Sequence, residues 1–231
     1  FDSYFGVLGG ATDFITRPAD GDIAAIIPGD NLTTRTRFPV SRGRTVVDEP
    51  RYLTEAFTQE ARGFIRSNRD KPFFLYLAYT APHTPLQATK KYADRFPAIT
   101  SPYQRAYAAM VSSLDDGVGE IMAELRAQGL EHDTVVIFLS DNGCAGYIRG
   151  GCTNRPLEAG KGSPWEGGIR VPFIISAPGR IPGGLVDDRM ISSLDIMPTA
   201  ARLAGVPAPA TAEGVDLMPA LGGRRPGAVR E

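Results

Sequence analysis

The feature that most constrains the fold is an uninterrupted apolar run, Thr134–Ser140, which leads directly into Asp141, Asn142 and Gly143. Such a run between turn residues is typical of a strand that is buried on both faces of a parallel sheet. In open α/β sheets, ligands bind beyond the carboxyl ends of the strands. The run therefore predicts that Asp141 and Asn142 lie at a binding edge of a sheet.

The side chains of Asp141 and Asn142 offer hard oxygen donors, which suit Ca²⁺ or Mg²⁺ far better than zinc. Two ligands do not make a metal site, and Asp-Asn-Gly by itself is also a common turn. Other segments have to decide between these two interpretations.

Two further apolar runs carry one polar group each near an end. Pro72–Tyr79 leads into a proline-rich loop that contains His83, and Lys161 lies in a glycine-rich loop before the run Val171–Ile175. Together with Asp141 and Asn142, these residues could bind an oxyanion. Taken singly, His83 could be a capping residue in a turn, and Lys161 could be a solvated loop lysine.

Apolar periodicity predicts helices over Tyr52–Ser67 and Pro102–Gln128, the second of which ends at Gly129. Strands are predicted over 71–79, 134–140 and 171–176, and a short helix is predicted after Asp195. Residues 1–50 are interpreted as loop with short strands over the site face. Helix then strand, repeated, predicts an α/β fold with a mostly parallel sheet flanked by helices.

Composition excludes several functional classes. The 231 residues suffice for one domain, and the net charge of −1 gives no basic field for nucleic acid. No apolar stretch approaches the about 18 residues of a membrane span. The spacing of Cys144 and Cys152 leaves a disulfide and two free thiols equally open.

Taken in order along the chain, these elements resemble the sulfatase family of the alkaline-phosphatase-like superfamily. The stretches that carry the resemblance are residues 1–6, 73–87, 135–143, 160–175 and 193–199. They span nearly the whole chain, and their order makes the resemblance specific. It implies a sulfatase-like α/β fold that is incomplete at both ends.

Two family features are missing from the sequence. Sulfatases carry an early Asp-Asp metal pair and then Cys-x-Pro-Ser-Arg, whose cysteine becomes the formylglycine nucleophile. Here Asp115-Asp116 lies in a predicted helix, Asp187-Asp188 lies in a loop, and neither cysteine has the required neighbours. We therefore expect residues 1–231 to be the central and C-terminal part of the catalytic domain, without the nucleophile segment and the small C-terminal domain.

The resemblance implies a role for each candidate residue. Asp141 and Asn142 match two ligands of Ca²⁺, with Mg²⁺ as an alternative, and Lys161 matches the lysine that binds sulfate. His83 matches the histidine beside the leaving oxygen, where an imidazole can act as a general acid near neutral pH. The formylglycine would lie in the missing N-terminal segment.

The loop 144–159 departs most from the family pattern, and loops that border a site often set specificity. We therefore expect Arg149 or Arg155 to contact the part of the substrate that is not sulfate. Trp165, Glu166 and Arg170 are interpreted as residues that brace the Lys161 loop. His132 is interpreted as an exposed linker residue.

The functional hypothesis is a sulfuric ester hydrolase acting on an aryl or carbohydrate sulfate, with half of the active site in this chain. The alternatives are a phosphodiesterase or phosphonate monoester hydrolase of the same superfamily, and a truncated non-catalytic homologue that binds anions. The expected ligand is a sulfated small molecule or glycan. Uncovered sheet edges predict self-association, and relatives of this family make an exported location the expectation.

Overall fold

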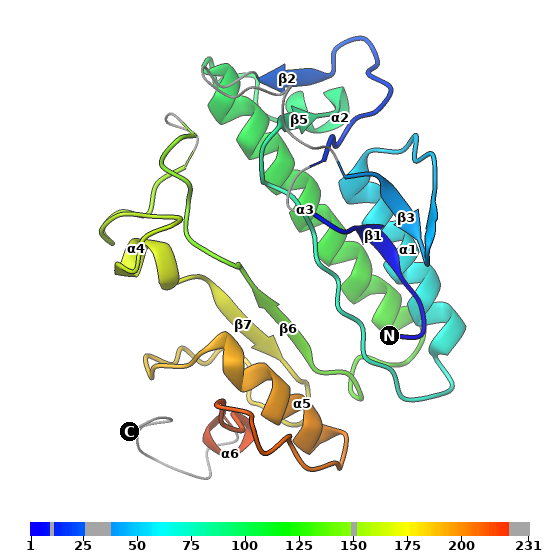
Figure 1. Ribbon diagram of the computed structural model, residues 1–231, viewed down its shortest axis with the longest axis vertical. Helices are drawn as coiled ribbons and strands as arrows, with labels where there is room; N and C mark the ends of the chain where they lie inside the picture. The colour runs from blue at the N-terminus through cyan, green and yellow to red at the C-terminus, as the bar shows by residue number, and fades with distance from the viewer. Residues whose placement is uncertain (10–11, 26–37, 149–151, 222–231) are drawn as a thin grey trace. The chain divides into compact units, whose positions relative to one another are not determined.

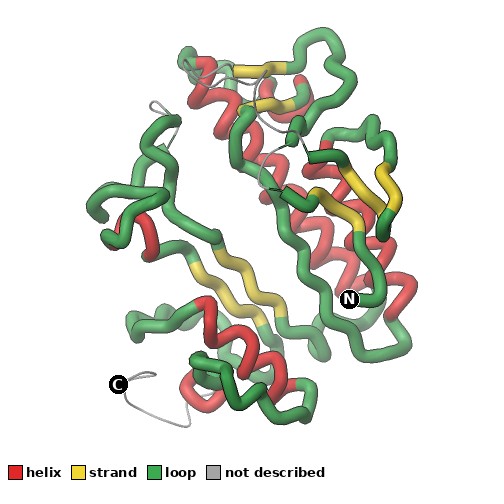
Figure 2. Tube along the Cα trace, in the orientation of Figure 1, coloured by secondary structure: helices red, strands yellow, loops and turns green. Residues whose placement is uncertain are grey.

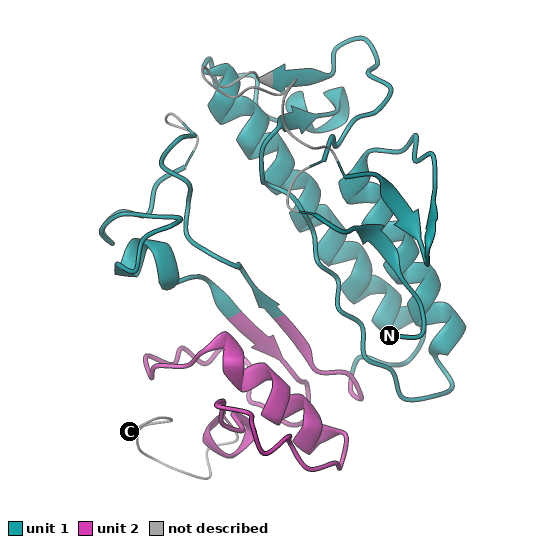
Figure 3. Ribbon diagram, in the orientation of Figure 1, with its two compact units in different colours: residues 1–131, 138–173 teal, residues 132–137, 174–231 magenta. Residues whose placement is uncertain are grey.

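The computed structural model describes residues 1–9, 12–25, 38–148 and 152–221. The chain divides into two compact units, which are considered separately here (Figure 3). Unit 1 comprises residues 1–131 and 138–173, and unit 2 comprises residues 132–137 and 174 onward. Arg149 lies outside the described residues, so its expected role stays a prediction.

Two long helices, α1 (Leu53–Asn68) and α3 (Pro102–Ala127), form the body of unit 1 (Figure 1). The Ser101 hydroxyl caps α3 by accepting a hydrogen bond from the backbone N–H of Gln104 at 3.4 Å. Gly129 follows the helix with φ +72°, the left-handed conformation that ends many helices. Both helices confirm the periodicity analysis to within one residue at each end.

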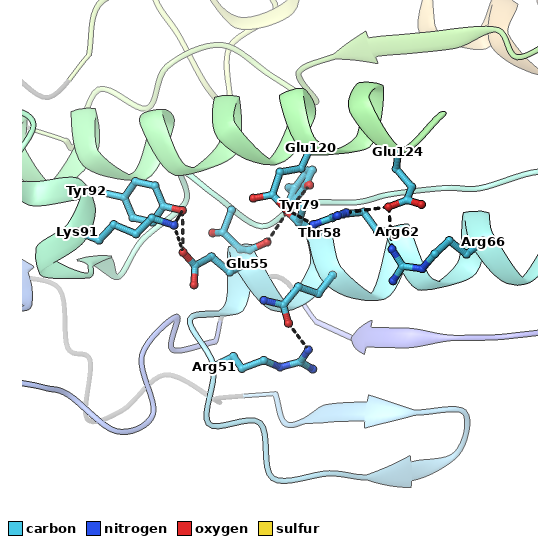
Figure 4. Close-up of polar contacts among 12 residues, drawn as sticks. Arg51, Glu55, Thr58, Arg62, Arg66, Tyr79, Lys91, Tyr92, Glu120 and Glu124 are labelled. Carbon is cyan, nitrogen blue, oxygen red and sulfur yellow. Dashed lines mark hydrogen bonds and ion pairs between the residues drawn. The ribbon is translucent and has the colours of Figure 1, made fainter. Parts of the chain in front are cut away.

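The two helices pack closely because α3 has a glycine at the contact. A Cβ atom on Gly117 would lie 2.6 Å from Thr58 Oγ1 and 2.8 Å from the Tyr79 hydroxyl. These two oxygens are hydrogen-bonded to each other at 2.7 Å (Figure 4). Any larger residue at position 117 would separate α1, α3 and the chain around Tyr79.

A charge network joins the C-terminal halves of the same helices (Figure 4). The Glu124 carboxylate, whose side chain is 5% exposed, accepts hydrogen bonds from Arg62 Nε at 3.1 Å and Arg66 Nη1 at 2.7 Å. Gln128 donates a third bond to it at 2.9 Å, and Arg62 also binds Glu120. Burial raises the pKa of Glu124, but the bonds from Gln128 and the two arginines outweigh burial and leave its pKa below the ordinary value.

Short antiparallel strands surround the helices. Strands β1 (Phe5–Val7), β3 (Val40–Arg42) and β4 (Thr45–Val46) form one sheet, and β2 (Ile23–Ala25) pairs with β5 (Leu86–Ala88). The short helix α2 (Lys90–Ala93) follows β5 and contacts α3. The expectation of loop with short strands before residue 50 is thus confirmed for the described residues.

A strand was predicted over 71–79. Residues 72–80 are extended but have no strand partner among the described residues, so we call them the extended segment. Alternate side chains face inward, as in a strand: Phe73 packs edge-on against Phe64, and Tyr79 lies against Phe57. The side chains between them point to solvent, with Phe74 60% exposed. The apolar run was predicted as a strand, but a strand also requires a neighbour with which to exchange backbone hydrogen bonds.

The predicted strands 134–140 and 171–176 are β6 (Val136–Leu139) and β7 (Phe173–Ser176), which pair with each other. β6 leads into the loops that contain helix α4 (Glu166–Ile169), and β7 leads back from them, so the two strands run in opposite directions (Figures 1 and 2). The strand pairs of the described residues are therefore antiparallel, and the parallel pairing expected for 134–140 is not among them. All residues of β6 are half-buried rather than fully buried, because the strand has one partner instead of two.

Unit 2 is built around helix α5 (Ile196–Leu203), which is preceded by the 3₁₀ turn Ser193–Asp195 and followed by helix α6 (Met218–Leu221). The short helix predicted after Asp195 is α5, and the Asp195 side chain makes no capping hydrogen bond to it. Its fully buried carboxylate instead accepts from the backbone of Ser192 and of Val215, both at 2.8 Å. The Asp195 carboxylate therefore links the 3₁₀ turn to the segment before α6.

The two cysteines are joined in a disulfide, with a Cα–Cα distance of 5.9 Å. The bond closes the loop after β6, and Ala145 and Ile148 in that loop belong to the hydrophobic core cluster that also contains Leu86. The structure thus selects the disulfide from the two alternatives that spacing left open.

We predict that Glu124→Gln lowers the melting temperature of the protein at pH 7 and flattens its dependence on acid pH. The pKa of this carboxyl lies below its ordinary value of 4.5. Its stabilising effect is therefore present above pH 4.5 and is lost as the pH falls through the folded-state pKa. Thermal unfolding between pH 7 and pH 3 measures both effects. Glu131→Gln, which loses one 3.4 Å contact with Arg126, is the control and should change little. An unchanged melting temperature and acid dependence in Glu124→Gln would contradict the network.

We also predict that neither cysteine reacts with iodoacetamide in the denatured, unreduced protein, and that both react after treatment with dithiothreitol. Intact-mass spectrometry reads the number of added groups. Closing a loop of eight positions should contribute about 2–3 kcal/mol by limiting the unfolded chain, so reduction should also lower the melting temperature. Labelling without reductant would show that the bond is absent.

Candidate functional site

The candidate site begins where β6 ends, because the chain turns sharply after Leu139. The Ser140 hydroxyl donates to the backbone carbonyl of Asn142 at 2.9 Å, which folds Asp141 into the turn. Gly143 then donates its backbone N–H to the carbonyl of Gly168 in α4 at 2.9 Å. Both Asp141 and Asn142 lie at this strand end, as the sequence predicted. The Asp141 side chain is exposed and the Asn142 side chain is half-buried.

Glycines make the contact between this turn and α4. A Cβ atom on Gly143 would lie 1.8 Å from the Gly167 carbonyl oxygen, and one on Gly168 would lie 2.2 Å from that of Ser163. Both distances are far inside any real contact, so the backbones can approach only without side chains. The same holds at Gly160, where a Cβ atom would lie 2.3 Å from the Cys144 carbonyl oxygen.

Lys161 is held against the same turn through its backbone. Its N–H donates to the Cys144 carbonyl at 3.1 Å, and Cys144 is the second residue after Asn142. The backbone of Lys161 therefore lies beside the turn that carries Asp141 and Asn142. We call residues 141–144 and 154–168, which these backbone bonds join, the loop assembly.

Asn154 holds the loop assembly together, and sequence analysis gave it no role. Its Oδ1 accepts from the N–H of Cys144 at 2.7 Å. Its Nδ2 donates to the carbonyls of Cys144 at 3.0 Å and Ala159 at 2.9 Å. An asparagine in a loop signals a turn, but no sequence pattern tells which backbone groups it will bind.

The candidate side chains of the loop assembly are not engaged by other described side chains. Within the described part of the chain, the side chains of Asp141, Asn142 and Lys161 form no hydrogen bond or ion pair. Asp141 and Asn142 could contribute two of the six to eight oxygen ligands of Ca²⁺. No group of three or more metal-binding side chains occurs among the described residues, so further ligands would have to come from elsewhere.

His83 is positioned separately, in the loop that precedes β5. Its backbone N–H donates to the Thr80 carbonyl at 2.9 Å, and its ring Nδ1 lies 2.8 Å from the Thr84 carbonyl oxygen. A carbonyl only accepts, so Nδ1 carries hydrogen and Nε2 is the ring nitrogen left for a ligand. His83 belongs to unit 1 like the loop assembly, but no hydrogen bond joins it to Asp141 or Lys161 in the described residues.

The remaining sequence expectations have mixed outcomes. Arg155 is exposed and lines a cavity of about 580 Å³ beside the disulfide. Trp165 was expected to pack against the Lys161 loop, yet it is 60% exposed. Glu166 and Arg170 bind each other at 3.4 Å across one turn of α4. His132 is exposed, as expected.

One carboxylate of each Asp-Asp pair is bound by an arginine. Asp116 accepts two bonds from Arg95, at 2.9 and 2.7 Å, and Asp187 binds Arg189. The hydrogen bonds and charge of Arg189 lower the pKa of Asp187 to about 2.

A protein-family model described as Sulfatase matches residues 1–206. The steryl-sulfatase of Homo sapiens is 39% identical over 181 residues, which cover 74% of this chain and 30% of that protein. The N-acetylgalactosamine-6-sulfatase of Rattus norvegicus is 37% identical over 175 residues, covering 73% of this chain and 32% of that protein. The chain thus spans about a third of the length of these relatives.

Solved structures agree with these matches. The crystal structure of Ps i-CgsB in complex with k-i-k-neocarrahexaose has a TM-score of 0.83 and 34% identity, covering 97% of this chain and 51% of that one. The PsFucS1 sulfatase from Pseudoalteromonas sp. has a TM-score of 0.66 and 29% identity, covering 80% of this chain and 39% of that one. These similarities confirm the predicted α/β fold class, and with the match over residues 1–206 they establish that the chain belongs to the sulfatase family.

Proposed function

We propose that the protein hydrolyses sulfate esters and that His83, Asp141, Asn142 and Lys161 are its contribution to the active site. One observation carries the proposal. A free lysine and two free hard-oxygen donors are locked into one hydrogen-bonded assembly at the end of a strand, in a chain of the sulfatase family. An anion-binding cation beside a metal-binding pair suits a substrate whose reacting group is itself an anion.

Lys161 would bind the sulfuryl oxygens. A lysine ammonium is a compact charge with three donors, which can follow the oxygens as charge builds on them during S–O cleavage. Its backbone bond to Cys144 fixes the base of the side chain, while the side chain itself has no competing acidic partner in the described residues. The lysine is thereby oriented without being neutralised.

His83 would protonate the oxygen that leaves with the alcohol. Because Nδ1 is occupied by the Thr84 carbonyl, the proton has to come from Nε2, so His83 acts in its imidazolium form. The backbone bond to Thr80 and the neighbouring core residues Ala81 and Leu86 hold the loop that carries the ring. In this division of roles, Lys161 binds the anionic sulfate group and His83 supplies the proton to the leaving oxygen.

The donor set of Asp141 and Asn142 fits Ca²⁺ best, with Mg²⁺ as the alternative. A bound cation would supply Lewis-acid polarisation of the sulfate group. Asp141 would add a negative charge to the site and Asn142 a neutral oxygen. The chain contains no Cys-x-Pro-Ser-Arg and both of its cysteines are in the disulfide, so a formylglycine nucleophile would come from residues other than these.

We place the substrate among sulfated glycans rather than aryl sulfates. Ps i-CgsB, which is similar over 97% of this chain, was crystallised with a carrageenan-type oligosaccharide. We further propose an exported location, which the disulfide supports because such bonds persist in oxidising compartments. None of the described helices is long and apolar enough to cross a membrane.

We also retain self-association as a proposal for the 231-residue chain made alone. The extended segment has unpaired backbone groups and exposes Phe74 and Tyr76, the second of them by 72%. Such an edge favours pairing with another chain.

The roles of Lys161 and His83 can be separated by the leaving group of the substrate. In the complete protein, Lys161→Ala should lower kcat/KM about 10²–10³-fold on both nitrophenyl sulfate and a sulfated sugar, because both transition states need the positive charge. His83→Ala should lower it strongly on the sugar only, since a nitrophenolate leaves without protonation. Lys71→Ala, in an exposed lysine after α1, is the control. Equal losses of kcat/KM on both substrates in His83→Ala would contradict the general-acid role. An unchanged kcat/KM in Lys161→Ala would contradict the proposed site.

The metal assignment has its own test. Asp141→Asn should weaken Ca²⁺ binding to the complete protein at least tenfold, because a charged ligand becomes neutral, while the fold is kept. Isothermal titration with Ca²⁺ after chelation measures the affinity, and circular dichroism checks the fold. Asp133→Asn, in an exposed carboxylate before β6, is the matched control. The assignment would be wrong if both variants bound Ca²⁺ like the parent protein.

A further inference from the structure

The cavity beside the disulfide belongs to the same loop assembly as Lys161. It has a volume of about 580 Å³, within the range of ligand-binding cavities. Its walls include Cys144, Cys152, Thr153, Asn154, Arg155 and Glu158. Because Cys144 and Asn154 also bind the Lys161 backbone and the chain around it, a ligand in this cavity would lie next to the sulfate-binding group.

The chemistry of the cavity walls favours a sugar. The described residues that line it include no aromatic side chain, whereas cavities for rings such as sterols or aryl groups are lined mainly by apolar and aromatic side chains. Beside the apolar residues Pro156, Leu157 and Ala159, the walls offer a hydroxyl, a guanidinium and a carboxylate. The Arg155 guanidinium donates and the Glu158 carboxylate accepts, and a sugar hydroxyl can satisfy both.

Arg155 is one of four arginines, with Arg44, Arg180 and Arg202, that are exposed and have no acidic partner among the described residues, and of these four it alone lines the cavity. Most others bind carboxylates, among them Arg42, Arg51, Arg62, Arg66, Arg95 and Arg189. An unpaired guanidinium offers a planar fork of donors that matches a sulfate or carboxylate in two parallel bonds. With Lys161 on the same assembly, the loop presents two free cations to a ligand.

We propose that this cavity binds the sugar adjacent to the one that loses its sulfate, and that Arg155 recognises an anionic group on that neighbouring sugar. The inference rests on the proposed function and extends it, since it makes the preferred substrate an oligosaccharide with at least two anionic groups. Glu158 accepts hydroxyl hydrogens of the same sugar. Arg155 is thereby a specificity-determining residue and takes no part in cleavage.

The test compares three substrates, two of which share one scissile ester. These are a galactan disaccharide with a single sulfate, the same disaccharide with a second sulfate on the neighbouring sugar, and nitrophenyl sulfate. In the complete protein, Arg155→Gln should lower kcat/KM about 10–100-fold on the disulfated disaccharide, mainly through KM, because a charged hydrogen-bonded pair is lost. The other two substrates should change less than about threefold, and Arg155→Lys should be intermediate. Arg180→Gln, in an exposed arginine of unit 2, should behave like the parent protein.

Equal losses on all three substrates, or no loss on the disulfated one, would overturn the inference. A parent protein that cleaves none of them would refute the proposed function, and the cavity would then be tested by binding alone. Isothermal titration with the disulfated disaccharide should show binding that Arg155→Gln weakens at least tenfold. The cavity assignment would be refuted if the parent protein failed to bind the disulfated disaccharide, or if Arg155→Gln bound it with the same affinity as the parent protein.

Discussion

The candidate site depends on backbone contacts that only glycine allows. Gly143 lies against Gly167, Gly160 lies against the carbonyl of Cys144, and Gly168 lies against the carbonyl of Ser163. These approaches let backbone N–H groups reach carbonyls in the next loop, which is why Lys161 and Asp141 belong to one assembly although they are far apart in sequence. Side chains at these positions would push the loops apart and separate Lys161 from Asp141 and Asn142.

The sequence predicted elements whose signals are local. α1 and α3 follow from apolar periodicity, and Asp141 at the end of β6 follows from the change from apolar to turn residues. Elements that depend on a distant partner were less accessible. The extended segment has the alternation of a strand, but pairing depends on a neighbour that no local pattern specifies. The direction of β7 relative to β6 likewise depends on how the loop between them closes.

The same distinction applies to the site. Lys161 and His83 were predicted from the resemblance and their place near strand-like runs, and the structure tests only how each is held. Asn154 was missed because its role lies in three backbone bonds that arise only when the loop is folded. The disulfide could not be decided from spacing, because that depends on the loop path between the two cysteines.

The order of the elements along the chain affects how the protein assembles during synthesis. α1, the extended segment and α3 are made before β6, and they already contain the Gly117 contact and the Glu124 network. This part of the chain can therefore become compact on the ribosome while the loop assembly is still being translated. The exposed face of Phe74 and Tyr76 stays uncovered during that interval. A chaperone that shields extended apolar segments would have its natural target there. The disulfide forms later, because an external oxidant can join Cys144 and Cys152 only after both residues have been made.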